Sequence, residues 1–213
     1  MSQDKNPAEP TREAYEKYAA TYDTQWSRYI QDTHKATAAQ LPDTEQPLTV
    51  LDIGCGTGQF LSHMQEGHSN WQLHGVDISA AMLAKAKDRL RASVSLVEMD
   101  GEELPYTTPD SFDLIVSLSS LHYWRNPGSL LEQIHHTLRP DGAFILTDWS
   151  RDTWSMQLMD TYLTVREKAH FYTYTTAELH DLLTRHRFSI TAHHTFHSTW
   201  PWHLQTVVAK KTN

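Results

Sequence analysis

The sequence contains a single cysteine, Cys55, among its 213 residues. One cysteine excludes an intrachain disulfide, which fits a reducing compartment. No apolar run approaches the roughly 20 residues that span a bilayer, and the polar N-terminus lacks the apolar core of a signal peptide. We therefore expect a cytoplasmic protein without membrane insertion.

Basic residues are also scarce, with 18 Lys and Arg against 26 Asp and Glu and a formal net charge of −8. Nucleic-acid-binding domains normally present a basic face, so we expect no nucleic-acid partner. Fourteen histidines are unusual, but they form no H-E-x-x-H pattern and no cysteine cluster accompanies them. We therefore predict no metal site.

Length and composition predict one globular domain over residues 1–213. Within it we expect residues 1–10 to be a disordered tail and residues 11–42 to form a helical arm or lid. Residues 48–148 should form a ligand-binding α/β core, and residues 149–213 two further helices and the last two strands.

The expected arm has aromatic residues at helical spacing. Tyr15, Tyr18 and Tyr22 recur three or four residues apart, and Trp26 and Ile30 continue the pattern at intervals of four. This spacing predicts a helix from about residue 11, followed by a second one over about 33–40. The aromatic side chains either help to wall a ligand pocket or only pack the arm onto the domain.

The most informative segment reads VLDIGCGTG, an apolar run that ends in Asp52 and leads into Gly54, Gly56 and Gly58. Glycine tolerates positive φ and lets the backbone approach a ligand closely. A strand that enters a helix through such a turn is the nucleotide-binding corner of open α/β sheets. Dinucleotide sites need a third glycine where Gln59 stands, and P-loops need a lysine that is absent here. The turn therefore suits a nucleoside without a pyrophosphate.

Two more acidic positions follow expected strands. Asp77 ends the second strand about 20 residues after the glycines, where a carboxylate can accept hydrogen bonds from ribose hydroxyls. A third strand, expected over residues 94–99, leads into Asp100 and Gly101 beside the position of a purine edge.

These segments resemble the class I S-adenosylmethionine-dependent methyltransferases of the small-molecule type. Five pieces occur in the family's order between about residues 48 and 149: LDIGCGTGQF, GVDIS, MDGEELPY, SFDLIVSLSSLHYW and LRPDGAFILTDW. The resemblance implies an α/β, Rossmann-like, seven-stranded and mostly parallel sheet sandwiched by helices, with the last strand antiparallel. It also implies S-adenosyl-L-methionine as the cofactor and an arm that closes over it.

Under this resemblance, the expected cofactor contacts follow the strands or lie on the arm. They are Asp52, Gly54, Gly56, Gly58, Asp77, Ile78, Met82, Asp100, Gly101, Ser117, Leu118, Tyr22 and Trp26. For Asp52, support of the glycine loop is as good an interpretation as contact with the cofactor's amine through water.

Methyl transfer from a sulfonium is an in-line displacement that needs a general base only when the acceptor arrives protonated. His122, which follows the fourth strand, is the candidate base because imidazole titrates near neutral pH, although a structural role remains open. Tyr15, Tyr123 and Trp149 are expected to contact the acceptor. The many aromatic residues after position 148 could line an apolar pocket or box a cationic amine.

We expect methylation of a small-molecule acceptor. One alternative is a carboxyl methyltransferase acting on an acyl group bound to a carrier protein, because SSLHYW and LRPDGAF resemble that group. Another alternative is a non-catalytic module that binds S-adenosylmethionine. Neither the acceptor atom (O, N, S or C) nor the oligomeric state is predicted.

Overall fold

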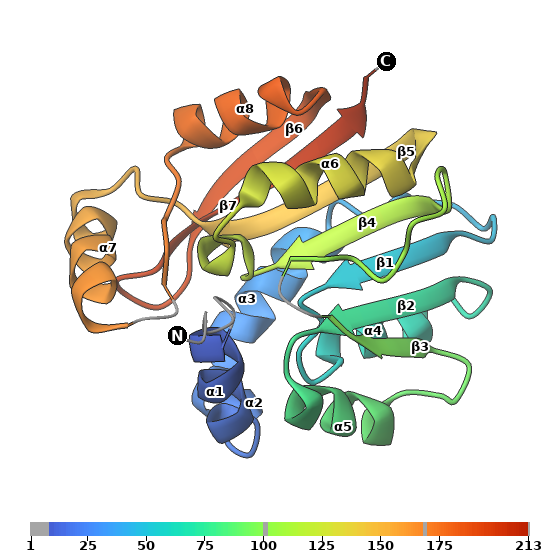
Figure 1. Ribbon diagram of the computed structural model, residues 1–213, viewed down its shortest axis with the longest axis horizontal. Helices are drawn as coiled ribbons and strands as arrows, with labels where there is room; N and C mark the ends of the chain where they lie inside the picture. The colour runs from blue at the N-terminus through green and yellow to red at the C-terminus, as the bar shows by residue number, and fades with distance from the viewer. Residues whose placement is uncertain (1–8, 100–101, 168–169, 213) are drawn as a thin grey trace, which may run out of the picture.

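The computed structural model describes residues 9–99, 102–167 and 170–212 (Figure 1). The predictions for Asp100, Gly101 and residues 1–8 of the tail lie outside these described residues. Helix α1 starts at Glu9, two residues before the expected start of the arm.

The described chain contains seven strands and eight α-helices. The strands are β1 (Thr49–Ile53), β2 (Gln72–Asp77), β3 (Ser95–Glu98), β4 (Phe112–Leu118), β5 (Leu138–Trp149), β6 (Phe188–His197) and β7 (His203–Lys211). The helices are α1 (Glu9–Tyr18), α2 (Tyr22–Gln25), α3 (Ser27–Ala38), α4 (Gln59–Gly67), α5 (Ala80–Arg89), α6 (Pro127–Thr137), α7 (Trp154–Arg166) and α8 (Thr176–Arg185). A short 3-10 helix, η1 (Leu121–Tyr123), follows β4.

The strands form one sheet in the order β3-β2-β1-β4-β5-β7-β6. Strands β1 to β5 pair in parallel, and β7 lies antiparallel between β5 and β6. This arrangement confirms the predicted seven-stranded, mostly parallel sheet with an antiparallel last strand. The order reverses between β1 and β4, and ligands of open α/β sheets bind outside the strand ends at such a point.

The central strands bury side chains on both faces, as parallel strands covered by helices do. In β4, Ile115 packs with α6 and α8 on one face, while Leu114 and Val116 pack with α4 and α5 on the other. Figure 1 shows the corresponding layers, with α6 and α8 in front of the sheet and α4 behind it. The alternation follows the two-residue period of a strand.

The N-terminal arm differs from its prediction. The expected long helix is broken at residues 19–21 and again at Trp26, and the expected second helix is part of α3. Thr21 precedes the short α2 and Thr24 lies within it, and the Thr24 hydroxyl donates to the Thr21 carbonyl (2.8 Å). Side chains of this kind compete with helical hydrogen bonds, which accounts for the break.

Candidate functional site

Three glycines with positive φ form the turn after β1. The φ angles of Gly54, Gly56 and Gly58 are 78°, 53° and 74°. A Cβ on Gly56 would meet no atom within 4 Å, whereas one on Gly58 would come within 2.9 Å of Ala86 and Leu90. Gly58 therefore permits close packing of the turn on α5, and Gly56 leaves space open above it.

Asp77 ties this turn to the end of β2. Its carboxylate accepts hydrogen bonds from the backbone N–H groups of Gly56 (2.8 Å) and Ser79 (2.9 Å). Burial raises the pKa of Asp77 to about 6, although these two hydrogen bonds act in the opposite direction. Asp77 therefore titrates near neutral pH while retaining lone pairs for a ligand.

Asp52, at the end of β1, is a buried acid with spare bonding capacity. Its Oδ1 atom has no hydrogen-bond partner among the described residues. Burial, and secondarily Asp77, raises the pKa of Asp52 to about 8. An unpartnered buried carboxyl oxygen is costly, so a ligand that brings an ammonium group to it would be stabilised. The methionine amine of S-adenosylmethionine fits this requirement.

Three cavities meet above the turn. The glycine-side cavity, of about 160 Å³, is lined by Gly54, Gly56, Asp77, Ile78, Met82 and Met99 from the sheet side, among others. The Asp52 cavity, of about 50 Å³, lies between the turn and α3. The aromatic cavity, of about 290 Å³, lies between the arm and the ends of β4 and β5. Tyr22 and Ser119 line all three, so ligands in separate cavities could meet there.

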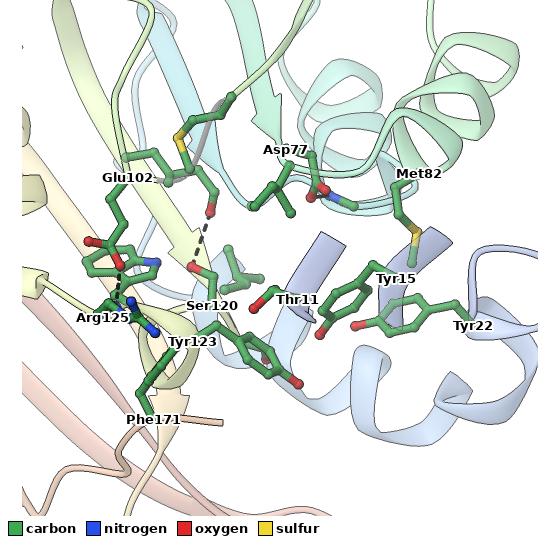
Figure 2. A pocket seen from close by; sticks show the side chains of 18 residues that line it. Thr11, Tyr15, Tyr22, Asp77, Met82, Glu102, Ser120, Tyr123, Arg125 and Phe171 are labelled. Atoms are coloured by element: carbon green, nitrogen blue, oxygen red, sulfur yellow. Dashed lines mark hydrogen bonds between the residues drawn. The ribbon is translucent and has the colours of Figure 1, made fainter. Parts of the chain in front are cut away.

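The arm closes one side of the glycine-side cavity. Figure 2 shows Tyr15 and Tyr22 reaching from the arm helices towards Asp77 and Met82 on the opposite wall. The rings of Tyr15 and Tyr22 pack edge to face, with centroids 5.9 Å apart. Burial raises the pKa of both tyrosines, so both phenols are neutral at physiological pH.

Polar contacts hold the arm in this position. On α1, Glu16 accepts a hydrogen bond from the Ser79 hydroxyl at 3.0 Å. On α2, Asp23 accepts from the Thr57 hydroxyl at 2.7 Å and forms an ion pair with Arg89 at 2.7 Å. The arm is therefore fastened to the glycine turn and to α5 by a small number of partly exposed bonds.

His122 forms a buried pair with Asp148. Its Nδ1 lies 2.6 Å from Asp148 Oδ1, and both side chains are 2% exposed. The Asp148 carboxylate also accepts hydrogen bonds from the backbone N–H groups of Leu121 and Trp149, so it acts as the acceptor towards His122. Nδ1 then carries the proton, and Nε2, which has no partner among the described residues, keeps a lone pair.

The structure brings most of the expected site residues to cavity walls. Those around the glycine-side cavity are Tyr15, Tyr22, Gly54, Gly56, Asp77, Ile78, Met82, Leu118 and Tyr123. Asp52 lines the Asp52 cavity, and His122, Trp149 and Trp26 line the aromatic cavity.

Three expected cofactor contacts lie elsewhere. Trp26, which immediately precedes α3, borders the aromatic cavity and not the glycine-side cavity, and its ring packs edge to face against Tyr29 and Trp202. Gly58 and Ser117 line none of the three cavities. The Ser117 hydroxyl donates to the Ile53 carbonyl at 3.1 Å, which bonds β4 to β1.

Several lining residues were not expected from the sequence, namely Thr11, Tyr29, Met99, Glu102, Arg125, Glu167 and Phe171. Ser119 carried a local signal, since it follows the fourth strand directly, and its φ is 54°. Conversely, Trp154, Tyr162 and Trp200 from the aromatic-rich second half are more than half exposed. The N-terminal arm, and not this second half, supplies most of the aromatic rings that line the aromatic cavity.

Two absences concern only the described residues. None of their helices is long and apolar enough to cross a membrane. Nor do these parts of the chain contain a group of three or more His, Cys, Asp or Glu side chains that could hold a metal ion.

The fold is shared with solved methyltransferases. An S-adenosylmethionine-dependent methyltransferase from Mesorhizobium loti is 22% identical with a TM-score of 0.71, covering 83% of this chain and 96% of that one. The Burkholderia thailandensis 1,6-didemethyltoxoflavin-N1-methyltransferase, solved with S-adenosylhomocysteine, is 21% identical with a TM-score of 0.75, covering 100% and 92%. A Haloferax volcanii protein solved in complex with the Trm112 methyltransferase activator has a TM-score of 0.80 at 18% identity, covering 93% and 98%.

Curated relatives match over part of their length. The malonyl-[acyl-carrier protein] O-methyltransferase of Legionella pneumophila is 27% identical over 138 residues, which are 64% of this chain and 47% of that protein. The mitochondrial arginine-hydroxylase NDUFAF5 of Mus musculus is 36% identical over 118 residues, 52% of this chain and 33% of that protein. The chain thus spans half or less of these relatives.

A family model described as a methyltransferase domain matches residues 20–193, most of the chain. That match covers the glycine turn, the three cavities' sheet-side walls and the His122–Asp148 pair. The chain therefore belongs to the methyltransferase domain family.

Proposed function

We propose that this methyltransferase acts on a small-molecule acceptor bound in the aromatic cavity, and that His122 takes the proton from the acceptor. The observation that carries this proposal is the unpartnered Nε2 of a histidine that lines the cavity and is fixed through Nδ1 by Asp148. The cavity's volume of about 290 Å³ suits a small ligand.

The cofactor would occupy the other two cavities. Asp77 would accept hydrogen bonds from the ribose hydroxyls, Gly56 would leave room for the nucleoside, and Asp52 would meet the methionine amine. When bound, S-adenosylmethionine supplies an electrophilic methyl group on a sulfonium. The protein's own contribution is to align the acceptor with that methyl group, exclude water and hold the departing proton.

The surroundings of His122 would stabilise it as a cation once it has taken the proton. Asp148 provides the opposite charge at 2.6 Å, and the Trp149 ring stacks on the imidazole with centroids 3.6 Å apart. Both contacts also fix the orientation of the ring beside the aromatic cavity. A purely cofactor-binding module would not need such a pair beside a second cavity.

Methylation of an acyl group on a carrier protein is the second candidate, because the Legionella relative bears that name. A malonyl carboxylate would need a cationic partner, but no Lys or Arg is among the described residues that line the aromatic cavity. The charge of the cavity therefore favours the small-molecule proposal.

Incubation of the purified protein with cell extract and cofactor labelled on the methyl carbon separates these candidates. After protein precipitation, we expect the label in a small-molecule fraction, where mass spectrometry identifies the product. Label that precipitates with an acyl-carrier protein would support the second candidate. No transfer to any fraction would favour a non-catalytic module.

A further inference from the structure

The walls of the aromatic cavity are built mainly from ring systems. Seven Tyr and Trp side chains line it: Tyr15, Tyr18, Tyr22, Trp26, Tyr29, Tyr123 and Trp149. Burial raises the pKa of Tyr29 and Tyr123, as it does for Tyr15 and Tyr22, so these phenols stay uncharged. The faces of such rings attract cations, with the largest effect where water is excluded.

Glu167 gives this cavity a negative charge. It follows α7 and is the one Asp or Glu among the described lining residues. Its carboxylate has no ion-pair or hydrogen-bond partner in the described parts of the chain, yet its charge acts on Tyr123. A cationic ligand would gain both this carboxylate and the ring faces, whereas an anionic ligand would meet repulsion.

We infer that the acceptor is a small amine that enters the aromatic cavity as a cation and is methylated on nitrogen. This inference rests on the proposed function, since it names the substrate class of the same site. The rings and Glu167 would select the ammonium form, and His122 would convert it into the nucleophile. A neutral phenol or alcohol would use the rings but not the carboxylate.

The reaction balances with the groups present. The ammonium R–NH3⁺ gives one proton to Nε2 of His122, which becomes an imidazolium paired with Asp148. The amine lone pair would then form the N–C bond to the methyl carbon that the sulfonium supplies, and the electron pair of the broken C–S bond would stay on sulfur. The product R–NH2⁺–CH3 leaves with its charge, and the imidazolium releases its proton to water.

Calorimetry in the presence of saturating S-adenosylhomocysteine tests this inference with three probes of the same shape. Choline is cationic, 3,3-dimethylbutan-1-ol is its neutral isostere, and 3,3-dimethylbutanoate carries a negative charge. We expect choline to bind at least tenfold more tightly than the alcohol, and the carboxylate to bind least. Trp26→Leu and Glu167→Gln should each reduce the preference for choline at least threefold. Glu132→Gln, on the far helix α6, should leave it unchanged.

Equal or tighter binding of the alcohol or the carboxylate overturns the inference, as does a preference for choline that survives both Trp26→Leu and Glu167→Gln. Choline that competes with S-adenosylhomocysteine also overturns it, because the two ligands should occupy separate cavities. Failure of S-adenosylhomocysteine itself to bind would instead overturn the proposed function, so the two failures are distinguishable.

Discussion

At the scale of single residues, His122 is the side chain on which methyl transfer should depend most. His122→Gln keeps a polar side chain near Asp148 but removes the basic Nε2. We expect the rate of methyl transfer to fall by about 10²–10⁴, the usual contribution of a general base, while S-adenosylhomocysteine affinity changes less than twofold. Single-turnover transfer of a labelled methyl group gives the rate, and calorimetry gives the affinity. An unchanged rate would reduce His122 to a packing role.

Asp77 should make cofactor binding pH-dependent. Its pKa of about 6 means that ionisation is incomplete below neutral pH, and the ionised form is the better acceptor for ribose hydroxyls. Affinity for S-adenosylhomocysteine should therefore rise as the pH increases from 5 to 7. Asp77→Asn should bind about tenfold more weakly at pH 7 and show a smaller rise between pH 5 and 7, because only the ionisation of Asp52 then remains. A wild-type affinity that is flat over this range contradicts the assignment.

Gly56 tests the position of the nucleoside. Valine there would place a branched side chain in the open space above the turn and strain a backbone with φ of 53°. We expect no measurable S-adenosylhomocysteine binding and a native circular dichroism spectrum. Gly67→Val is the matched control, because its Cβ also meets nothing within 4 Å but lies away from the cavities. Undiminished binding by Gly56→Val would place the ligand elsewhere.

At the scale of elements, the arm divides into a fixed part and a movable part. In α3, Tyr29 and Ile30 are 6% exposed and pack with Trp149, Met156 and other members of a buried cluster. Helices α1 and α2 bury far less and are held mainly by the Glu16 and Asp23 contacts. A truncation that removes only the movable part should therefore end before Ser27, where α3 begins. The helical spacing in the sequence alone would have placed the end of that truncation at residue 30.

The movable part should order when cofactor binds. Hydrogen exchange across α1 and α2 should slow on addition of S-adenosylhomocysteine, whereas α3 should be protected with or without it. Asp23→Asn should speed dissociation of S-adenosylhomocysteine several-fold by weakening the contact with Arg89 and Thr57. The exposed Asp43→Asn serves as the control. Equal protection of α1 in both states would show that the arm is a fixed part of the core.

Element boundaries were predictable where a local cap sets them. Ser79 caps α5 and Asn126 caps α6, and their side chains accept hydrogen bonds from the backbone N–H groups of Met82 and Ser129. Strand β5 is assigned from Leu138, which pairs with Phe112, but the register with β4 shifts before the next pair, Leu114 with Ala143. Continuous pairing with both neighbours therefore begins at Ala143, and the isolated pair at Leu138 depends on a distant segment that a single sequence does not display.

At the scale of the whole molecule, the sheet topology and the cofactor were predictable because ordered motifs around the glycine turn specify both. The meeting of three cavities at Tyr22 and Ser119 was not predictable. It depends on the break between α1 and α2, on the positive φ of Ser119 and on the packing of α3 against β5. These are long-range consequences of packing, so the sequence indicated the cofactor contacts more completely than the acceptor cavity.

A crystal structure with bound S-adenosylhomocysteine tests the central claim most directly. The account predicts ribose hydroxyls at Asp77, the amine at Asp52 and the sulfur between Tyr22 and Ser119, with the aromatic cavity left open beside His122. An S-adenosylhomocysteine molecule that fills the aromatic cavity against Trp149 and leaves Asp77 without contact would contradict it.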